Sequence, residues 1–211
     1  MPAAARLAAT LGTRAAGARH VVDAALKGRL EAALKECADD ARASVLVEHM
    51  NGRSPTYEEC TETLMTRPDG QPVTRAMWLG EQMHRVALRC VEEKLNAFMS
   101  GRFSLEPRYW HNPKTRQLEW LSPEEVKALL QQGRGAELRG SIQPDLVIHL
   151  GDPLHAQGIY DFKFACMHNG KADWREYPEG HPYEFSSQKE VYEELLRARA
   201  FRVMPHWGIL P

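Results

Sequence analysis

Hydrophobic and polar positions recur along the chain with two periods, one typical of helices and one typical of strands. A period of about 3.6 residues, with suitable end signals, predicts helices over 1–50, 54–65, 74–99, 122–132 and 187–200. Asn51-Gly52 and Ser100-Gly101 supply the stop signals for two of these helices. Ser122 and Ser187 begin capping boxes, and Ser54-Pro55 offers an N-cap followed by a first-turn proline.

A period of two residues predicts the strands. They are expected near 102–110, 117–121, 143–150, 159–164 and 202–206. The polar, aromatic-rich stretch 166–185 shows neither period and predicts a long loop. Helices and strands therefore mix along the chain, which predicts the α/β (mixed α+β) class. We expect a helical N-terminal extension over 1–70 and a domain over 71–211.

Charged residues interrupt two of the predicted strands. In the strand near 143–150, the two-residue period places Asp145 and His149 on one face. In the strand near 159–164, Asp161 and Lys163 share one face and aromatic side chains fill the other. Charges among otherwise apolar strands must be paired or bind a metal ion, because an unpaired buried ion costs several kcal/mol. A salt bridge and a metal ion each meet that need.

The helix over 74–99 carries a candidate partner for these charges. Its strongly polar residues occupy about a third of the circumference. His84 falls within the apolar arc, and Glu81 lies at the margin of that arc. A histidine on an apolar face is usually a hydrogen-bonded core residue. Beside two aspartates, however, an imidazole nitrogen can hold a divalent ion together with carboxylate oxygens.

The last helix carries a polar pair near its start. Gln188 and Tyr192 lie four residues apart and therefore on one face. Both side chains can hydrogen-bond a phosphate or a base, and a helix N-terminus attracts anions. Taken alone, a tyrosine packed in the core and a glutamine on the surface explain this pair better.

Composition sets mild bounds on function. The 211 residues carry a formal net charge of −1, which is not typical of a protein that coats nucleic acid electrostatically. A nucleic-acid substrate would need a local basic groove. Its candidates, each read equally well as solvated surface, are Arg102, Arg108, Lys114, Arg116, Arg134 and Arg139. No apolar run approaches the ~18 residues of a membrane span.

The N-terminus and the cysteines give further expectations. The alanine-rich start lacks the apolar core of a signal peptide and indicates a helical stem or the cut edge of a longer polypeptide. The 4 cysteines show no CxxC and no zinc-ligand spacing. Cys90 and Cys166 fall in apolar patterns and are expected to be buried thiols. Cys37 and Cys60 would pair only in an oxidising compartment, and we expect them to stay unpaired.

A family resemblance rests on motifs that follow one order along the chain. They are Gly80-x-x-x-His84, Pro144-Asp145, Asp161-x-Lys163 and Gln188-x-x-x-Tyr192. This set resembles the PD-(D/E)xK nuclease superfamily, and within it the RecB-like and lambda-exonuclease-like branch. Pro-Asp with Asp-x-Lys is weak alone, but the full ordered set is far more specific. The resemblance covers about 75–205 and implies a restriction-endonuclease-like core, with a central mixed sheet flanked by helices.

The resemblance also implies site roles. The implied ligands of Mg²⁺, for which Mn²⁺ substitutes, are His84, Asp145, Asp161 and the backbone carbonyl of Phe162. The implied catalytic residues are Asp145, Asp161, Lys163 and Gln188, and the implied substrate-binding residues are Gln188 and Tyr192. Lys163 would orient or help deprotonate the attacking water. The GxxxH spacing favours His84 over Glu81 as the ligand from the helix, although the choice stays open, and His149 is a candidate supporting residue.

The implied activity is metal-dependent hydrolysis of phosphodiester bonds in DNA. The later region also resembles restriction-endonuclease-fold toxin domains at the C-terminal ends of bacterial polymorphic toxins, which an immunity protein neutralises. We therefore expect a soluble bacterial effector nuclease that acts in the cytoplasm of a target cell. The alternatives are a repair or phage-type exonuclease, and a non-catalytic binding module with a buried ion pair.

Overall fold

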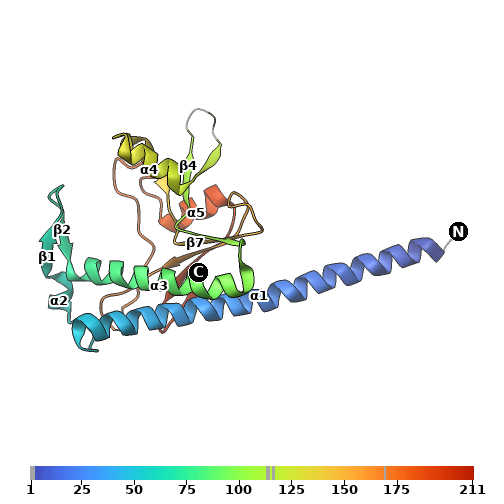
Figure 1. Cartoon of the computed structure of the whole chain (residues 1–211), viewed down its shortest axis with the longest axis horizontal. Coiled ribbons are helices and arrows are strands. Elements are labelled where there is room, and N and C mark those ends of the chain that lie inside the picture. The colour runs from blue at the N-terminus through green and yellow to red at the C-terminus, as the bar shows by residue number, and fades with distance from the viewer. Residues whose placement is uncertain (1–2, 113–114, 116, 169) are drawn as a thin grey trace.

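The computed structural model describes residues 3–112, 115, 117–168 and 170–211, with the backbone alone for 3–23. The α-helices are α1 (Ala3–Met50), α2 (Tyr57–Thr61), α3 (Arg75–Met99), α4 (Pro123–Gln131) and α5 (Gln188–Leu196), and η1 (Gly135–Leu138) is a 3₁₀ turn. Strands β1 to β10 span Thr63–Thr66, Pro72–Thr74, Phe103–Leu105, Arg108–His111, Leu118–Leu121, Ser141–Ile142, Leu146–His149, Ala156–Phe162, Ala200–Met204 and Gly208–Leu210. The predicted mixture of helices and strands is confirmed (Figure 1).

A mixed sheet of five strands organises the described chain. Its order is β10-β9-β8-β7-β3. Strands β8 and β9 run parallel, and the other neighbours run antiparallel. Strands β8 and β9 can run parallel because the connection between them, which contains α5, returns the chain to the end of the sheet where β8 begins. Two smaller sheets, β5-β4-β6 and β1-β2, stand beside it.

Helices cover both faces of this sheet. On one face α1 and α3 pack side by side, and their apolar residues join those of the strands (Figure 1). This core includes Leu34, Ala87, Leu95, Leu146 and Phe162. On the other face α5 packs through Val191, Tyr192 and Leu196 against Val147 and Ile159. The alternation predicted for the two central strands is confirmed, because neighbouring residues of β7 and β8 enter different cores.

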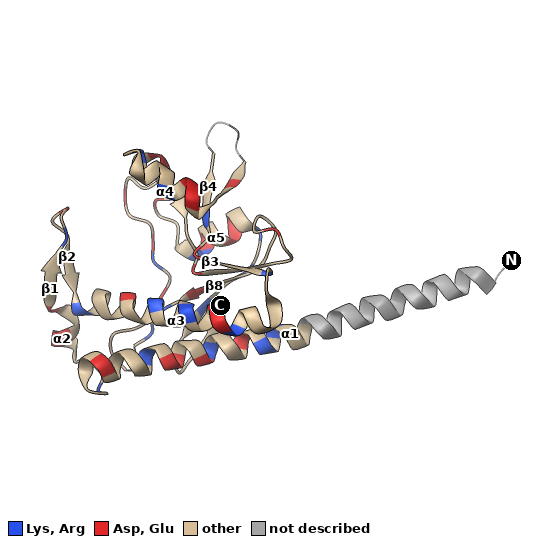
Figure 2. Ribbon diagram, viewed as in Figure 1, with Lys and Arg blue, Asp and Glu red and all other residues tan. Residues whose placement is uncertain are grey.

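The predicted N-terminal extension contributes to the same core. From Leu30 onward, buried residues of α1 pack against α3 and the sheet. Met50 ends the helix, and Asn51 and Gly52 follow with φ of 52° and 78°, the left-handed conformation expected of a C-terminal stop. The division of the chain at residue 70 stays a prediction. Figure 2 shows acidic and basic residues interspersed along the described part of α1.

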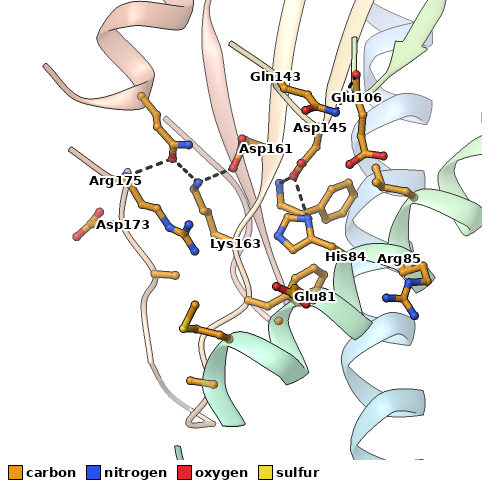
Figure 3. A pocket seen from close by; sticks show the side chains of 18 of the residues that line it. Glu81, His84, Arg85, Glu106, Gln143, Asp145, Asp161, Lys163, Asp173 and Arg175 are labelled. Carbon is orange, nitrogen blue, oxygen red and sulfur yellow. Dashed lines mark hydrogen bonds and ion pairs between the residues drawn. The ribbon is translucent and has the colours of Figure 1, made fainter. Parts of the chain in front are cut away.

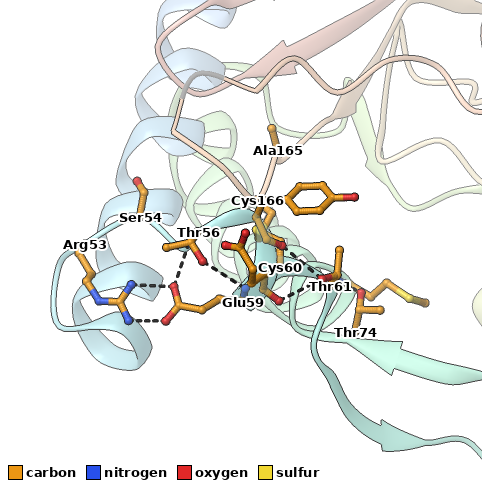
Figure 4. Close-up of a disulfide and its surroundings, with 12 residues drawn as sticks. Arg53, Ser54, Thr56, Glu59, Cys60, Thr61, Thr74, Ala165 and Cys166 are labelled. Atoms are coloured by element: carbon orange, nitrogen blue, oxygen red, sulfur yellow. Dashed lines mark hydrogen bonds and ion pairs between the residues drawn. A yellow bond between two sulfur atoms is a disulfide. The ribbon is translucent and has the colours of Figure 1, made fainter.

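Two disulfides correct the cysteine predictions. Cys37 pairs with Cys90 and thereby joins α1 to α3. Cys60 pairs with Cys166 and thereby joins α2 to the segment that leaves β8 (Figure 4). The expectation of buried thiols was wrong. Cys37 and Cys60, which were expected to stay unpaired, do form disulfides, although not with each other. Helix and strand patterns locate a cysteine on an element but do not tell which elements become neighbours.

Several predicted boundaries also need correction. Thr56, not Ser54, caps α2, because its side chain accepts the N–H of Glu59 and the Glu59 carboxylate accepts the N–H of Thr56. Arg53 holds the same carboxylate (Figure 4). Residues 63–66 form a strand of a hairpin rather than the end of that helix. The predicted strand 102–110 is two strands, β3 and β4, which belong to different sheets.

The last predicted helix is shorter than expected. It ends at Leu196 because Arg197 adopts the left-handed conformation, with φ of 51°, and β9 begins at Ala200. The capping boxes at Ser122 and Ser187 and the start of α3 at Thr74 are confirmed. Within the described residues, no helix combines the length and apolar character needed to cross a membrane.

Candidate active site

A cavity of about 730 Å³ opens between α3, the adjoining ends of β7 and β8, and the start of α5 (Figure 3). The motif residues that line it are His84, Asp145, Asp161, Lys163, Gln188 and Tyr192. These residues come from three parts of the sequence more than 20 positions apart, and the fold brings them together. The structure therefore places every motif side chain of the predicted site in one cavity.

Asp145 is fixed by neighbours from two elements. Its Oδ2 accepts the backbone N–H of Phe162 at 2.7 Å and lies 3.3 Å from Nδ1 of His84. The register Leu146↔Tyr160, continued by one position, sets Asp145 opposite Asp161. The turn before β7 thus holds one carboxylate against the strand that carries the other.

Asp161 and Lys163 form a buried ion pair at the end of β8. The Lys163 ammonium lies 2.6 Å from Oδ2 of Asp161. Asp161 is 4% exposed and Lys163 is 9% exposed. Residues two apart in a strand project from the same face, and here that face is the one covered by α5. The salt bridge weighed from the sequence is therefore present.

Lys163 is held by further contacts. Its ammonium donates a hydrogen bond to Oε1 of Gln188, at 2.8 Å, and lies 5.2 Å from the ring centre of Trp174. The same oxygen of Gln188 accepts the backbone N–H of Arg175 at 3.4 Å. Gln188 thus orients the lysine and ties the segment before α5 to the site.

Tyr192 lies deeper than the other motif residues. It is 2% exposed, and its hydroxyl donates a hydrogen bond to the backbone carbonyl of Gln143 at 3.4 Å. Burial raises the pKa of Tyr192 well above its ordinary value, so the hydroxyl remains a proton donor. The tyrosine supports the turn before Asp145. Its predicted contact with substrate, and that of Gln188, stays a prediction.

The electrostatics of the site reflect burial and like charge. Burial, and after it the charge of Asp145, raises the pKa of Asp161 above its ordinary value, although Lys163 acts in the opposite direction. Burial alone would lower the pKa of His84. The hydrogen bond to Asp145 and the charges of both aspartates outweigh it, and the pKa of His84 is raised. The positive charges of Lys163 and protonated His84 therefore favour the ionised form of Asp161, whereas the charge of Asp145 disfavours it.

Glu81 and His84, the two candidates on the helix, have different surroundings. His84 contacts Asp145 and packs edge-on against the ring of Phe164, with ring centres 5.2 Å apart. Glu81 instead forms an ion pair with Arg67 of the β1–β2 hairpin, at 2.9 Å. Within the described residues only His84 of the two contacts a site carboxylate, so the geometry favours His84.

His149 lies apart from the site. Its ring nitrogens interact with the hydroxyl of Ser104, at 3.0 Å, and with the N–H of Gly151, at 3.1 Å. It stands at the opposite end of β7 from Asp145. Strand alternation predicts both residues on one face, but the length of the strand keeps them apart. His149 braces β3 against β7.

None of the described residues predicted for a basic groove lines the cavity. Arg108 bonds Ser141 and Gln143, Arg134 bonds Glu137, and Arg139 bonds the carbonyl of Gly180. Lys114 and Arg116 lie outside the described residues, and Arg102 is exposed. The arginines that line the cavity are Arg67, Arg85 and Arg175.

Other residues of the cavity wall were not found from the sequence. Arg175 lines the cavity and belongs to the long loop before α5, where no periodic pattern marks any residue. Trp174, which precedes it, does not line the cavity but contacts the ammonium of Lys163. Glu106 enters through the turn between β3 and β4, and its N–H donates to the carbonyl of Asp145 at 2.9 Å. No sequence signal would have identified them, because each reaches the site through tertiary packing.

The donor set can be compared with the predicted metal site. Over the part of the chain that the structure describes, no group of three His, Cys, Asp or Glu side chains is arranged to hold a metal ion. Asp145 and Asp161 nevertheless face one cavity, and burial together with the charge of Asp145 raises the pKa of Asp161. Two carboxylates fit a hard divalent cation by chemistry. Phe162 contributes its N–H to Asp145, and the role of its carbonyl stays a prediction.

Comparisons with known proteins add no relative. No protein-family model, no curated protein and no solved structure matches this chain.

Proposed function

We propose that this chain is a divalent-metal-dependent deoxyribonuclease with a restriction-endonuclease-like core. One observation carries the proposal: Asp145, Asp161, Lys163 and Gln188 meet in a single open cavity, although they come from separate elements. A structural ion pair needs only two of them. Two carboxylates, a lysine and its positioning glutamine around accessible space are groups that could support metal-dependent phosphodiester hydrolysis.

The placement of the motifs supports the proposed core. Gly80 and His84 lie on α3, Asp145 and Asp161 lie at the adjoining ends of β7 and β8, and Gln188 opens α5. Each motif thus sits on the kind of element that the resemblance implies. The mixed sheet with helices on both faces has the build expected of such a core.

The residues of the chain would share the chemistry as follows. Asp145, Asp161 and His84 would hold Mg²⁺. When bound, the ion would stabilise negative charge on the scissile phosphate and lower the pKa of a bound water. Lys163 lies beside the carboxylate of Asp161 and would orient that water and balance charge on the phosphate. Gln188 would keep the ammonium aimed into the cavity through its hydrogen bond.

Supercoiled plasmid incubated with Mg²⁺ tests the proposal. Nicking and linearisation are the expected result, and both should cease when a chelator removes the metal. Degradation of linear DNA alone would instead favour the repair or phage-type exonuclease. No reaction with any divalent ion would favour the binding module, in which Asp161 and Lys163 form only a buried pair.

Substitutions connect the activity to the site. We expect Asp161→Ala and Lys163→Ala each to abolish cleavage while the protein stays folded. Asp152→Ala is the matched control, because that carboxylate is exposed and bonds His155 outside the cavity. Full activity in either site variant, or equal loss in the control, would refute the assignment.

The biological setting that we propose is an antibacterial toxin. Such a nuclease would arrest growth when expressed in bacterial cytoplasm and would need an immunity protein as partner. Harmless accumulation of an active enzyme would count against this setting but not against the nuclease. A small adjacent reading frame that suppresses the toxicity would identify the partner.

A further inference from the structure

Among the described residues, one cation in the cavity wall has no side-chain partner. The other cationic side chains of the wall are engaged in the pairs Arg67–Glu81, Arg85–Gln82 and Lys163–Asp161. Arg175 is exposed and lines the cavity, and within the described residues its guanidinium makes no hydrogen bond or ion pair. The carboxylate of Asp173, two residues before it, forms an ion pair with Arg202 instead.

The backbone of Arg175 is nevertheless firmly held. Its carbonyl accepts the N–H of Gln188 at 2.8 Å, and its N–H donates to Oε1 of the same glutamine at 3.4 Å. Trp174, the preceding residue, packs beneath the ammonium of Lys163. The guanidinium therefore starts from an anchored point, and Figure 3 shows it on the side of the cavity where Lys163 lies.

We propose that Arg175 binds a phosphate oxygen of the nucleic-acid backbone next to the scissile group. The inference rests on the proposed function and names a substrate-binding residue outside the four motifs. A guanidinium forms strong paired hydrogen bonds with phosphate. Because no carboxylate holds Arg175, a phosphate displaces no existing partner. The backbone hydrogen bonds to Gln188 keep Arg175 close to Lys163 and leave its guanidinium available for the phosphate.

The salt dependence of binding tests this role directly. A fluorescently labelled duplex of 20 base pairs is titrated in EDTA, where the proposed cleavage does not occur, at several salt concentrations. Each phosphate contact contributes about −0.9 to the slope of log K against log salt. We expect Arg175→Ala to weaken binding about tenfold and to reduce the slope by about 0.9. Arg175→Lys, which keeps the charge, should retain the slope.

Arg89→Ala is the matched control, since Arg89 is exposed on α3 and lies outside the cavity. It removes the same charge, and we expect its slope to equal that of the wild type. A slope for Arg175→Ala equal to that of the wild type, or an equal reduction in the control, would overturn the inference. So would wild-type protein that binds no duplex. Failure of the proposed function appears separately, as intact plasmid in the Mg²⁺ assay.

Discussion

The Lys163 ammonium lies 2.6 Å from the carboxylate of Asp161, and both side chains are almost fully buried. The pair stands at the end of β8, and Gln188 of α5 completes it by accepting a hydrogen bond from the ammonium. Burial raises the pKa of Asp161 and thereby disfavours its charged form, while the lysine opposes that effect. A chain without a use for this charge would be as stable with apolar residues here. The pair therefore bears on stability and, under the proposed function, on activity.

Removing one member of the pair should cost more than removing both. Lys163→Met leaves the carboxylate of Asp161 buried without its cation, and we expect a loss of about 3–5 kcal/mol in the free energy of unfolding. Asp161→Asn combined with Lys163→Met should cost less than Lys163→Met alone, and therefore clearly less than the sum of the two single changes. Urea denaturation of the four proteins measures the coupling. Strict additivity would show that the pair does not act as a unit.

The contact between His84 and Asp145 should stabilise the metal-free protein more at acidic pH. The folded pKa of His84 is raised, so its charged form is favoured in the folded state. The contribution is complete below the unfolded pKa of about 6.5 and is lost as pH rises through the raised folded value. Denaturation of wild type and His84→Gln in EDTA at several pH values measures it. The difference between the two should shrink as pH rises, and a difference that grows would contradict the assignment.

Metal binding should be detectable without catalysis. If Asp145 and Asp161 hold Mg²⁺, the ion binds the folded state preferentially and raises the melting temperature. Calorimetric melting with and without Mg²⁺ measures the shift. Asp145→Asn should remove most of it, because one hard ligand and one negative charge are lost. Asp152→Asn, outside the cavity, should keep it. An equal shift in all three proteins would indicate that the ion binds elsewhere.

The disulfide between Cys60 and Cys166 should contribute substantially to stability. It closes a sequence separation of 106 residues, against 53 for the bond between Cys37 and Cys90. Replacing Cys60 and Cys166 with serine should lower the free energy of unfolding by about 2–4 kcal/mol. Denaturation under non-reducing conditions measures the loss, with the Cys37→Ser, Cys90→Ser protein for comparison. A negligible loss would show that other contacts already fix this segment.

The buried guanidinium of Arg42 also holds the segment that contains Cys166. It donates to the carbonyl of Ala165 at 2.5 Å and to the carbonyl of Cys166 at 3.3 Å. Together with the disulfide, it fixes the path of the chain directly after Lys163. The pattern of apolar positions in the first helix gave no sign of this role, because Arg42 acts on residues more than 120 positions away.

Local signals in the sequence predicted much of the framework. The helix from Arg75 to Met99 matches the predicted bounds, since Thr74 caps it and Ser100-Gly101 ends it. The capping boxes at Ser122 and Ser187 are formed as expected. Errors arose where a local sequence pattern is compatible with both a helix and a strand. Residues 63–66 form a strand because 72–74 offer them a partner.

The candidate site was predictable where it depends on strand alternation and motif spacing. These placed Asp161 and Lys163 on one face and brought Asp145 to the neighbouring strand. They did not reveal that Gln188 binds the lysine or that Tyr192 is buried behind the site. Both depend on how α5 crosses the sheet, and that is a property of packing.

The sequence by itself determined most of the helices and strands, their amphipathic faces and the set of charged groups, because these follow from spacing along the backbone. The tertiary structure alone decided which cysteines meet, which arginine lines the cavity, and that Glu81 contacts Arg67 while His84 contacts Asp145. These contacts join residues far apart in the chain. Their partners depend on the burial of apolar faces over the whole fold, and no local pattern encodes that.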